Sequence, residues 1–123
     1  MGDLLDKMKE YEDVLKEKNQ DKRIEIVLTD AYGDDEIQTA FCCYLEDYIK
    51  FPFEAKIRND RNSEKFKVLR FTSIVPQRVV CEIEFKEGIK SRMPLTEIEP
   101  LDKKSANNIV IRDYLKFINE DYE

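Results

Sequence analysis

The sequence predicts an α+β fold, in which helices precede and follow a small antiparallel β-barrel or curled sheet along the chain. The prediction rests on the spacing of apolar residues, which is helical at first, alternates from Phe53 onward, and becomes helical again near the end. The chain has 123 residues, of which 41% are hydrophobic, and this suits one domain with one core. We therefore expect a single domain over residues 1–123.

The helical part is expected to cover about residues 1–51. Its helices are predicted over residues 3–18, 23–31 and 34–48. The second of these also fits an alternating strand, and we favour the helix. The third has the clearest apolar stripe, with Asp34 placed to cap it and Pro52 placed to end it. The stripe consists of Ile37, Ala40, Phe41, Tyr44, Leu45 and Tyr48.

The barrel is expected to cover about residues 52–101. Alternating apolar residues predict strands over residues 53–57, 65–71, 79–85 and 89–95. Glu87-Gly88 is typical of a tight hairpin turn, and Pro94 indicates an edge strand. Several short antiparallel strands stay soluble when the sheet curls or closes. A last helix follows at about residues 105–119, with Ser105 as its cap and an apolar stripe of Ile111, Tyr114, Leu115 and Ile118.

The composition disfavours most catalytic and disulfide chemistry. The chain has no His, which removes the commonest general base and metal ligand. Its three cysteines, Cys42, Cys43 and Cys81, form no CxxC pair, and their number is odd. We find no signal-peptide pattern and no apolar run of membrane-spanning length. We therefore expect a cytoplasmic protein with free thiols, which is not an enzyme.

The negative charge is concentrated in one window of the sequence. The chain carries 21 bases and 27 acids, a net charge of −6. Residues 30–49 contain no Lys or Arg, and outside them acids and bases balance. Such a window repels nucleic acid and anionic lipid, so we expect neither as a partner. It suits a cation or a basic protein or peptide. Its acids are Asp30, Asp34, Asp35, Glu36, Glu46 and Asp47.

Four segments carry a resemblance to a known family. They are DAYGDDE at 30–36, YLED at 44–47, FPFEAK at 51–56 and MPLTEIEPLD at 93–102. In this order and spacing the chain resembles the cyanobacterial-type calcium-binding protein family over roughly residues 24–118. The resemblance implies an SH3-like barrel flanked by helices, and calcium binding without EF-hands.

The acids of the window divide into two candidate calcium sites. An EF-hand that starts at Asp30 would place Asp35 at the required glycine and Phe41 at the bidentate glutamate, so that register fails. Glu36 and Asp47 are separated by about 16 Å along a helix, which is too far for one ion. The candidates are therefore an N-terminal cluster of Asp30, Asp34, Asp35 and Glu36, and a C-terminal pair of Glu46 and Asp47.

The same acids also have interpretations that need no ion. Asp34 can act as a helix cap, Asp35 and Glu36 can offset the helix dipole, and the C-terminal pair can be a solvated face. Further calcium ligands would come from loop acids, for which Asp60, Glu64, Glu99 and Asp102 are available. We predict a low-affinity calcium-binding protein. The alternative is a protein-interaction module with an acidic surface for a basic partner, which exposed aromatic rings at Tyr32 or Tyr48 would favour.

Overall fold

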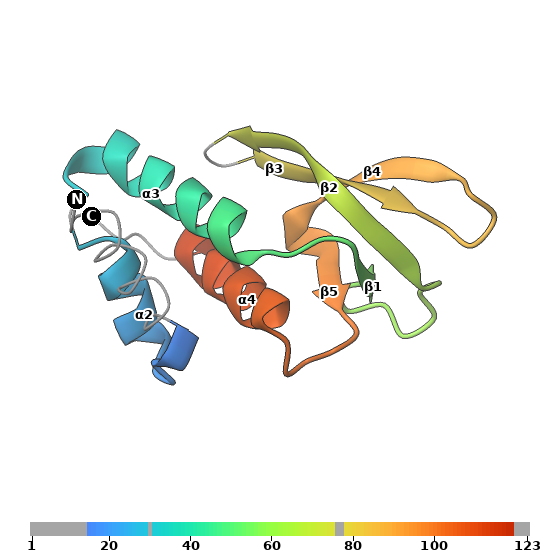
Figure 1. Cartoon of the computed structure of the whole chain (residues 1–123), viewed down its shortest axis with the longest axis horizontal. Coiled ribbons are helices and arrows are strands. Elements are labelled where there is room, and N and C mark those ends of the chain that lie inside the picture. The colour runs from blue at the N-terminus through green and yellow to red at the C-terminus, as the bar shows by residue number, and fades with distance from the viewer. Residues whose placement is uncertain (1–14, 30, 76–77, 120–123) are drawn as a thin grey trace, which may run out of the picture.

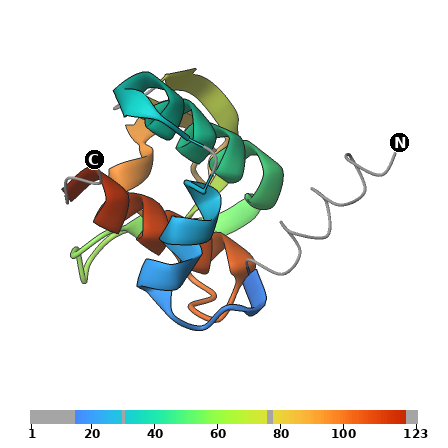
Figure 2. The same cartoon turned by 90° about the vertical axis from the view of Figure 1, so that its left-hand side faces the viewer.

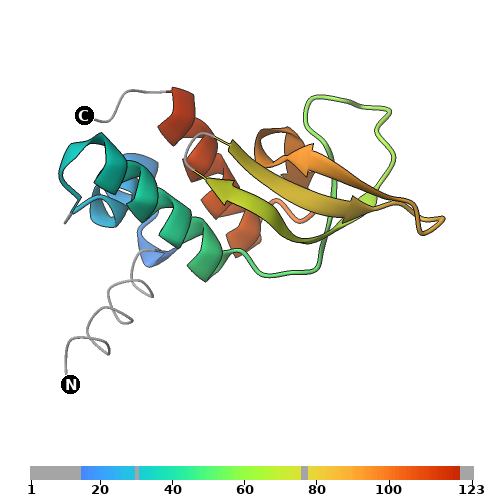
Figure 3. The same cartoon turned by 90° about the horizontal axis from the view of Figure 1, so that it is seen from above.

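The computed structural model describes residues 15–29, 31–75 and 78–119, and within them it contains helices at one end and an antiparallel sheet at the other (Figures 1 and 3). The helix predicted over residues 3–18 lies almost entirely outside the described residues. In chain order the elements are α2 (Gln20–Val27), α3 (Gly33–Tyr48), β1 (Phe53–Ile57), β2 (Phe66–Val75), β3 (Arg78–Glu84), β4 (Lys90–Pro94), η1 (Leu95–Glu97), β5 (Ile98–Pro100) and α4 (Ala106–Asn119). None of the helices in the described part is long and apolar enough to span a membrane.

The first described helix confirms the preference for helix over strand near residues 23–31. It begins at Gln20 because the Asn19 side chain accepts a hydrogen bond from the N–H of Lys22, at 3.2 Å. Asn19, which looks like a break in the sequence, is therefore the cap of this helix.

The predicted capping of α3 is wrong in its detail. The helix starts at Gly33, with Tyr32 as its N-cap residue and no side-chain cap. Gly33 has a φ of 82°, which favours glycine, and the N-cap residue lies two positions before the expected Asp34. Asp34 thus belongs to the first turn. The N–H of Tyr32 instead donates to Oε2 of Glu36, at 2.7 Å.

The last helix follows its sequence pattern closely. The Oγ of Ser105 accepts a hydrogen bond from the N–H of Asn108 at 3.2 Å, so Ser105 caps α4 as expected. Ile111 and Tyr114 are buried, whereas Ile118 at the end of the stripe is exposed.

The strands form one five-stranded sheet in the order β4-β3-β2-β1-β5. All its pairings are antiparallel, and two register shifts bend the long pairing of β2 with β3. The predicted hairpin turn is confirmed, because Gly88 has a φ of 80° and the N–H of Phe85 donates to the carbonyl of Ile89 at 2.9 Å.

The sheet is open, so the closed barrel predicted for residues 52–101 is not confirmed. β4 and β5 lie at opposite edges of the sheet and do not pair within the described residues. Pro94 ends β4 without a backbone N–H, and η1 turns the chain before β5 pairs with β1. Helix α4 lies between the other helices and the sheet (Figure 1), and all layers contribute to one buried core.

A buried ion pair connects the three helices. Asp113 of α4 is fully buried, and its carboxylate accepts two hydrogen bonds from Arg23 of α2, at 2.8 and 2.9 Å. The hydroxyl of Tyr44 of α3 donates to the same carboxylate at 2.9 Å. Arg23 also donates to the backbone carbonyl of Glu17 at 2.6 Å. Figure 2 shows α2, α3 and α4 gathered on this side of the molecule.

Removing one partner of this network should cost much more stability than removing both charges. Asp113→Ala leaves the Arg23 guanidinium buried without its counter-ion, and we expect a loss of roughly 3–5 kcal/mol in the free energy of unfolding. Tyr44→Phe should cost roughly 1–3 kcal/mol, because it removes one hydrogen bond to a charged group. The double variant Arg23→Met with Asp113→Leu should lose less than Asp113→Ala. Urea unfolding followed by circular dichroism measures all three, and equal losses in the first and last variants would contradict the expectation.

The protein should also lose stability in alkali. Burial raises the pKa of the Cys81 thiol to about 12, and burial likewise raises the pKa values of Tyr44 and Tyr114. Above the ordinary pKa of 9.0 for the thiol, the unfolded chain releases a proton that the native chain keeps. The free energy of unfolding should therefore fall between pH 9 and about 12. The urea midpoint of Cys81→Ala should fall less steeply with pH across this range than that of the unmodified protein. An identical slope for the two proteins would contradict the role of this thiol.

Candidate metal centre

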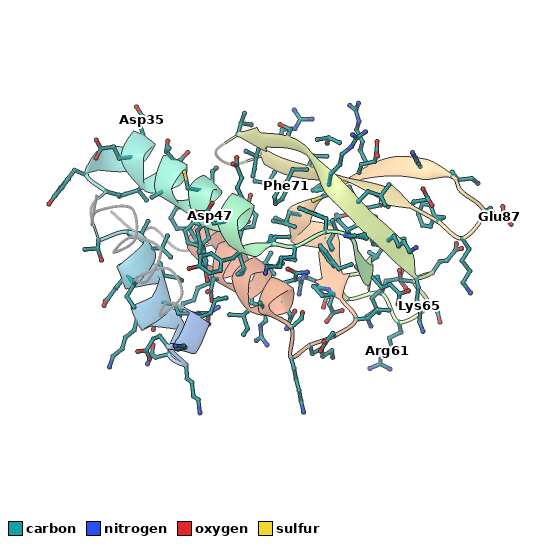
Figure 4. All side chains as sticks on the ribbon, viewed as in Figure 1. Asp35, Asp47, Arg61, Lys65, Phe71 and Glu87 are labelled. Atoms are coloured by element: carbon teal, nitrogen blue, oxygen red, sulfur yellow. The ribbon has the colours of Figure 1, made fainter. Side chains whose placement is uncertain are left out.

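Four acids of the charged window have described side chains, and all four belong to α3. Asp35, Glu36, Glu46 and Asp47 are all exposed. Asp35 and Asp47 mark the two ends of the helix in Figure 4. Asp30 lies outside the described residues, and for Asp34 only the backbone, in the first turn of α3, is described.

The N-terminal cluster lies at the positive end of the helix dipole. One oxygen of Glu36 accepts the N–H of Tyr32, which leaves this carboxylate tied to the start of the helix. Acids are stabilised at this end without any ion, whereas a cation here meets the unfavourable end of the dipole. Calcium could therefore bind Asp35 and Glu36 only if its attraction to the two carboxylates exceeds its repulsion by the positive end of the helix dipole.

The C-terminal pair has the opposite relation to the dipole. Glu46 and Asp47 occupy the last turn of α3, which contains no basic residue, and the helix ends at Tyr48. Here the dipole is negative, so it destabilises the two carboxylates and favours a cation beside them. The neighbouring backbone also offers carbonyl oxygens of the helix end, which are ligands that calcium accepts.

The charges of the C-terminal pair contribute to the raised pKa values of two nearby thiols, those of Cys42 and Cys43. Cys43 is exposed one turn before it, and Cys42 is half-buried. The pKa of Cys43 is raised by partial burial first and then by the charges of Asp47 and Glu46. The pKa of Cys42 is raised by burial, by Cys43 and by Glu46. All three cysteines are free, as expected, and Cys81 is buried in the core.

The structure does not bring the two groups of acids together. Among the side chains that it describes, no three acids or thiols are close enough to hold one ion. The loop acids are engaged locally. Asp60 accepts the N–H of Asn62 at 2.9 Å, Asp102 accepts the N–H of Lys104 at 3.0 Å, and Glu99 lies 3.7 Å from Lys56. The loops therefore add no carboxylate to either candidate site in the described part of the chain.

Comparison of the chain with known proteins identifies its family. Residues 22–118 match a protein family described as calcium binding. The chain belongs to this calcium-binding family. Calcium is accordingly its expected ligand, and the resemblance found in the sequence is confirmed. Among curated proteins, none matches this chain.

Two solved structures share the fold. The crystal structure of Anabaena CcbP is 22% identical, with a TM-score of 0.69, and the match covers 87% of this chain and 94% of that one. A calcium-binding protein in its calcium-binding form is also 22% identical, with a TM-score of 0.66, and here the match covers 89% of this chain and 97% of that one. Both therefore have the same arrangement of helices and sheet as this family member.

The sequence interpretation missed the buried carboxylate of Asp113. The signal was present, because Asp113 lies three residues after Val110 and next to Tyr114, within the buried stripe of α4. A carboxylate on an apolar stripe requires a buried partner. The interpretation gave no way to identify Arg23, which lies ninety residues earlier, as that partner.

Proposed function

We propose that this family member binds calcium with low affinity through clustered Asp and Glu side chains outside any EF-hand, as a non-catalytic cytoplasmic protein. The observation that carries the proposal is the solvent side of α3, where Asp35, Glu36, Glu46 and Asp47 are exposed and no basic residue belongs to the helix. None of these four carboxylates has an ion-pair partner among the described side chains. The two acids at each end of the helix repel each other, and a divalent cation relieves that repulsion.

Low affinity follows from the exposure of these acids. Calcium takes six to eight oxygen ligands, and tight sites supply most of them from a preformed loop. Within the described residues, each candidate site offers two exposed carboxylates from successive positions of α3, so water would complete the coordination. Charges at an exposed surface also attract an ion weakly, because solvent screens them.

Each of the two candidate sites has a specific argument in its favour. The N-terminal cluster has more acids, with Asp30, Asp34, Asp35 and Glu36 within seven positions. The C-terminal pair of Glu46 and Asp47 has the favourable helix dipole and nearby carbonyl oxygens. Both are proposed as calcium sites, and variants that remove charge from one or the other distinguish between them.

Calcium should raise the melting temperature of the protein by a few degrees. At a free calcium concentration of about ten times Kd, binding to the native state adds about 1.4 kcal/mol, which corresponds to a shift of this size for a domain of this length. Differential scanning calorimetry measures it, with sodium chloride of equal ionic strength as the reference. If calcium raises the melting temperature no more than sodium chloride does, the increase comes from ionic screening and the proposed binding is contradicted.

Paired substitutions assign the site. Asp34→Asn with Asp35→Asn removes charge from the N-terminal cluster, and Glu46→Gln with Asp47→Asn removes it from the C-terminal pair. The matched control is Glu87→Gln with Glu97→Gln, two exposed acids of the sheet region. The pair that holds the ion should abolish the calcium-dependent shift, and the control should retain it. Retention of the full shift by both α3 variants would contradict the proposed ligands.

The reactivity of Cys43 gives a second, local measure. If calcium occupies the C-terminal pair, the charges of Glu46 and Asp47 no longer raise the pKa of this thiol, and its thiolate fraction increases. Alkylation of Cys43 by iodoacetamide at pH 8, in a Cys42→Ala background, should then become faster with calcium. The increase should vanish in the variant Glu46→Gln with Asp47→Asn. An unchanged rate, alongside a calcium-dependent melting shift, assigns the ion to the N-terminal cluster.

A second candidate function is supported by Tyr32. Its side chain is 78% exposed beside Asp35 and Glu36, so an aromatic ring and two carboxylates face solvent together. This combination suits a basic peptide, whose cations can meet both the acids and the ring face. Tyr32→Ala should weaken the binding of a lysine-rich peptide severalfold, measured by calorimetric titration. Ile89→Ala, another exposed apolar residue, is the control, and equal binding by both variants would contradict this function.

A further inference from the structure

A cavity lined by residues of the sheet and by Tyr114 of α4 is not used by the calcium function. Its volume is about 540 Å³, within the usual range for small-molecule sites. Residues of β2, β3, β4, η1 and α4 line it. Its floor is apolar, with Val80 of β3 opposite Pro94 of β4. Thr72, Ser73, Thr96 and Tyr114 complete the lining, and the hydroxyl of Thr72 donates to the carbonyl of Val80 at 3.2 Å.

Two arginines line this cavity, and no acid of the described chain does. They are Arg78 at the start of β3 and Arg92 on β4. Arg92 lies opposite Glu82 in the register of β3 and β4, and Glu82 is four residues beyond Arg78 on β3. The Cα atoms of Arg78 and Arg92 are therefore about 14 Å apart. Their long side chains therefore approach the cavity from opposite ends, over Val80 and Pro94.

Neither arginine forms an ion pair with a neighbour among the described residues. The nearest acid by register is Glu82, and Arg70 of β2 engages both of its oxygens, at 3.3 and 3.4 Å. Arg78 and Arg92 themselves are exposed and have no ion-pair partner among the described side chains. The cavity thus combines two available guanidinium groups with hydroxyls and an apolar floor.

We propose that this cavity binds an organic phosphate monoester, whose phosphate meets Arg78 and Arg92 and whose apolar part lies on Val80 and Pro94. Two cations match the charge of a phosphate monoester, which is close to −2 at neutral pH. Guanidinium groups donate parallel hydrogen bonds to phosphate oxygens, and hydroxyls can donate to the remaining oxygen. The apolar floor gives a preference for a ligand with a carbon body over inorganic phosphate. The site is separate from α3, so it does not depend on the calcium proposal.

Titration with phenyl phosphate, followed by NMR of the ¹⁵N-labelled full chain in the presence of a chelator, tests this directly. We expect amide shifts at Val79, Val80 and Thr96 that saturate, beyond those caused by sodium chloride of equal ionic strength. Phenyl phosphate should bind more tightly than inorganic phosphate, which lacks the apolar part, and than benzoate, which has one charge. Benzoate binding of equal strength would overturn the assignment to a phosphate, and absence of saturable shifts at these amides would overturn the site.

Variants make the test quantitative. Arg78→Gln with Arg92→Gln should weaken phenyl phosphate binding by at least about tenfold, since it removes both charged donors. The control, Arg61→Gln with Arg112→Gln, removes the same charge from exposed positions outside the cavity and should change binding by less than about twofold. Equal weakening in both variants would show that net charge, and not this cavity, attracts the anion. The amide shifts of the unmodified chain locate the site even if a variant folds poorly.

Discussion

The buried ion pair between Arg23 and Asp113 is the contact on which the helical half of the molecule depends. A fully buried carboxylate is costly unless every oxygen is satisfied. Here two bonds from Arg23 and one from Tyr44 meet that requirement. Since the three side chains come from α2, α4 and α3, the network is complete only when all three helices are in place. It therefore specifies their relative positions more narrowly than apolar packing does.

This constraint also determines which side of α3 faces solvent. Tyr44 points inward to Asp113, and Phe41 and Leu45 on the same stripe are buried. The opposite side of the helix must then face water, and it carries the exposed acids Asp35, Glu36, Glu46 and Asp47. These acids therefore lie on a helix whose position is held by the buried network, and this also fixes the positions of their Cα atoms. Their relation to the helix dipole is equally fixed, and it differs between the two ends of α3.

Local periodicity predicted most of the fold, and long-range pairing accounts for what it missed. The stripe of α3, the alternation of β3 and the turn at Gly88 depend on neighbouring residues, so the sequence reveals them. Closure of the sheet depends on whether β4 meets β5, which no local pattern encodes. Likewise, six acids were predictable as a charged surface, but their convergence on an ion depends on packing across the chain. The predicted cap of α3 was wrong because the chain enters this helix through Gly33 at a positive φ, which the sequence pattern did not indicate.

The net charge of −6 describes neither face of this protein. The described charged side chains of α3 are all acids, whereas the cavity on the sheet is lined by Arg78 and Arg92 without an acid in the described chain. Screening limits each field to about 10 Å at ordinary ionic strength, so an approaching ligand responds to the nearest cluster of charges. The two proposed sites, one for a cation and one for an organic anion, therefore lie on different elements of one small fold. Because Glu82 is already engaged by Arg70, the sheet keeps its positive character despite the acidic chain around it.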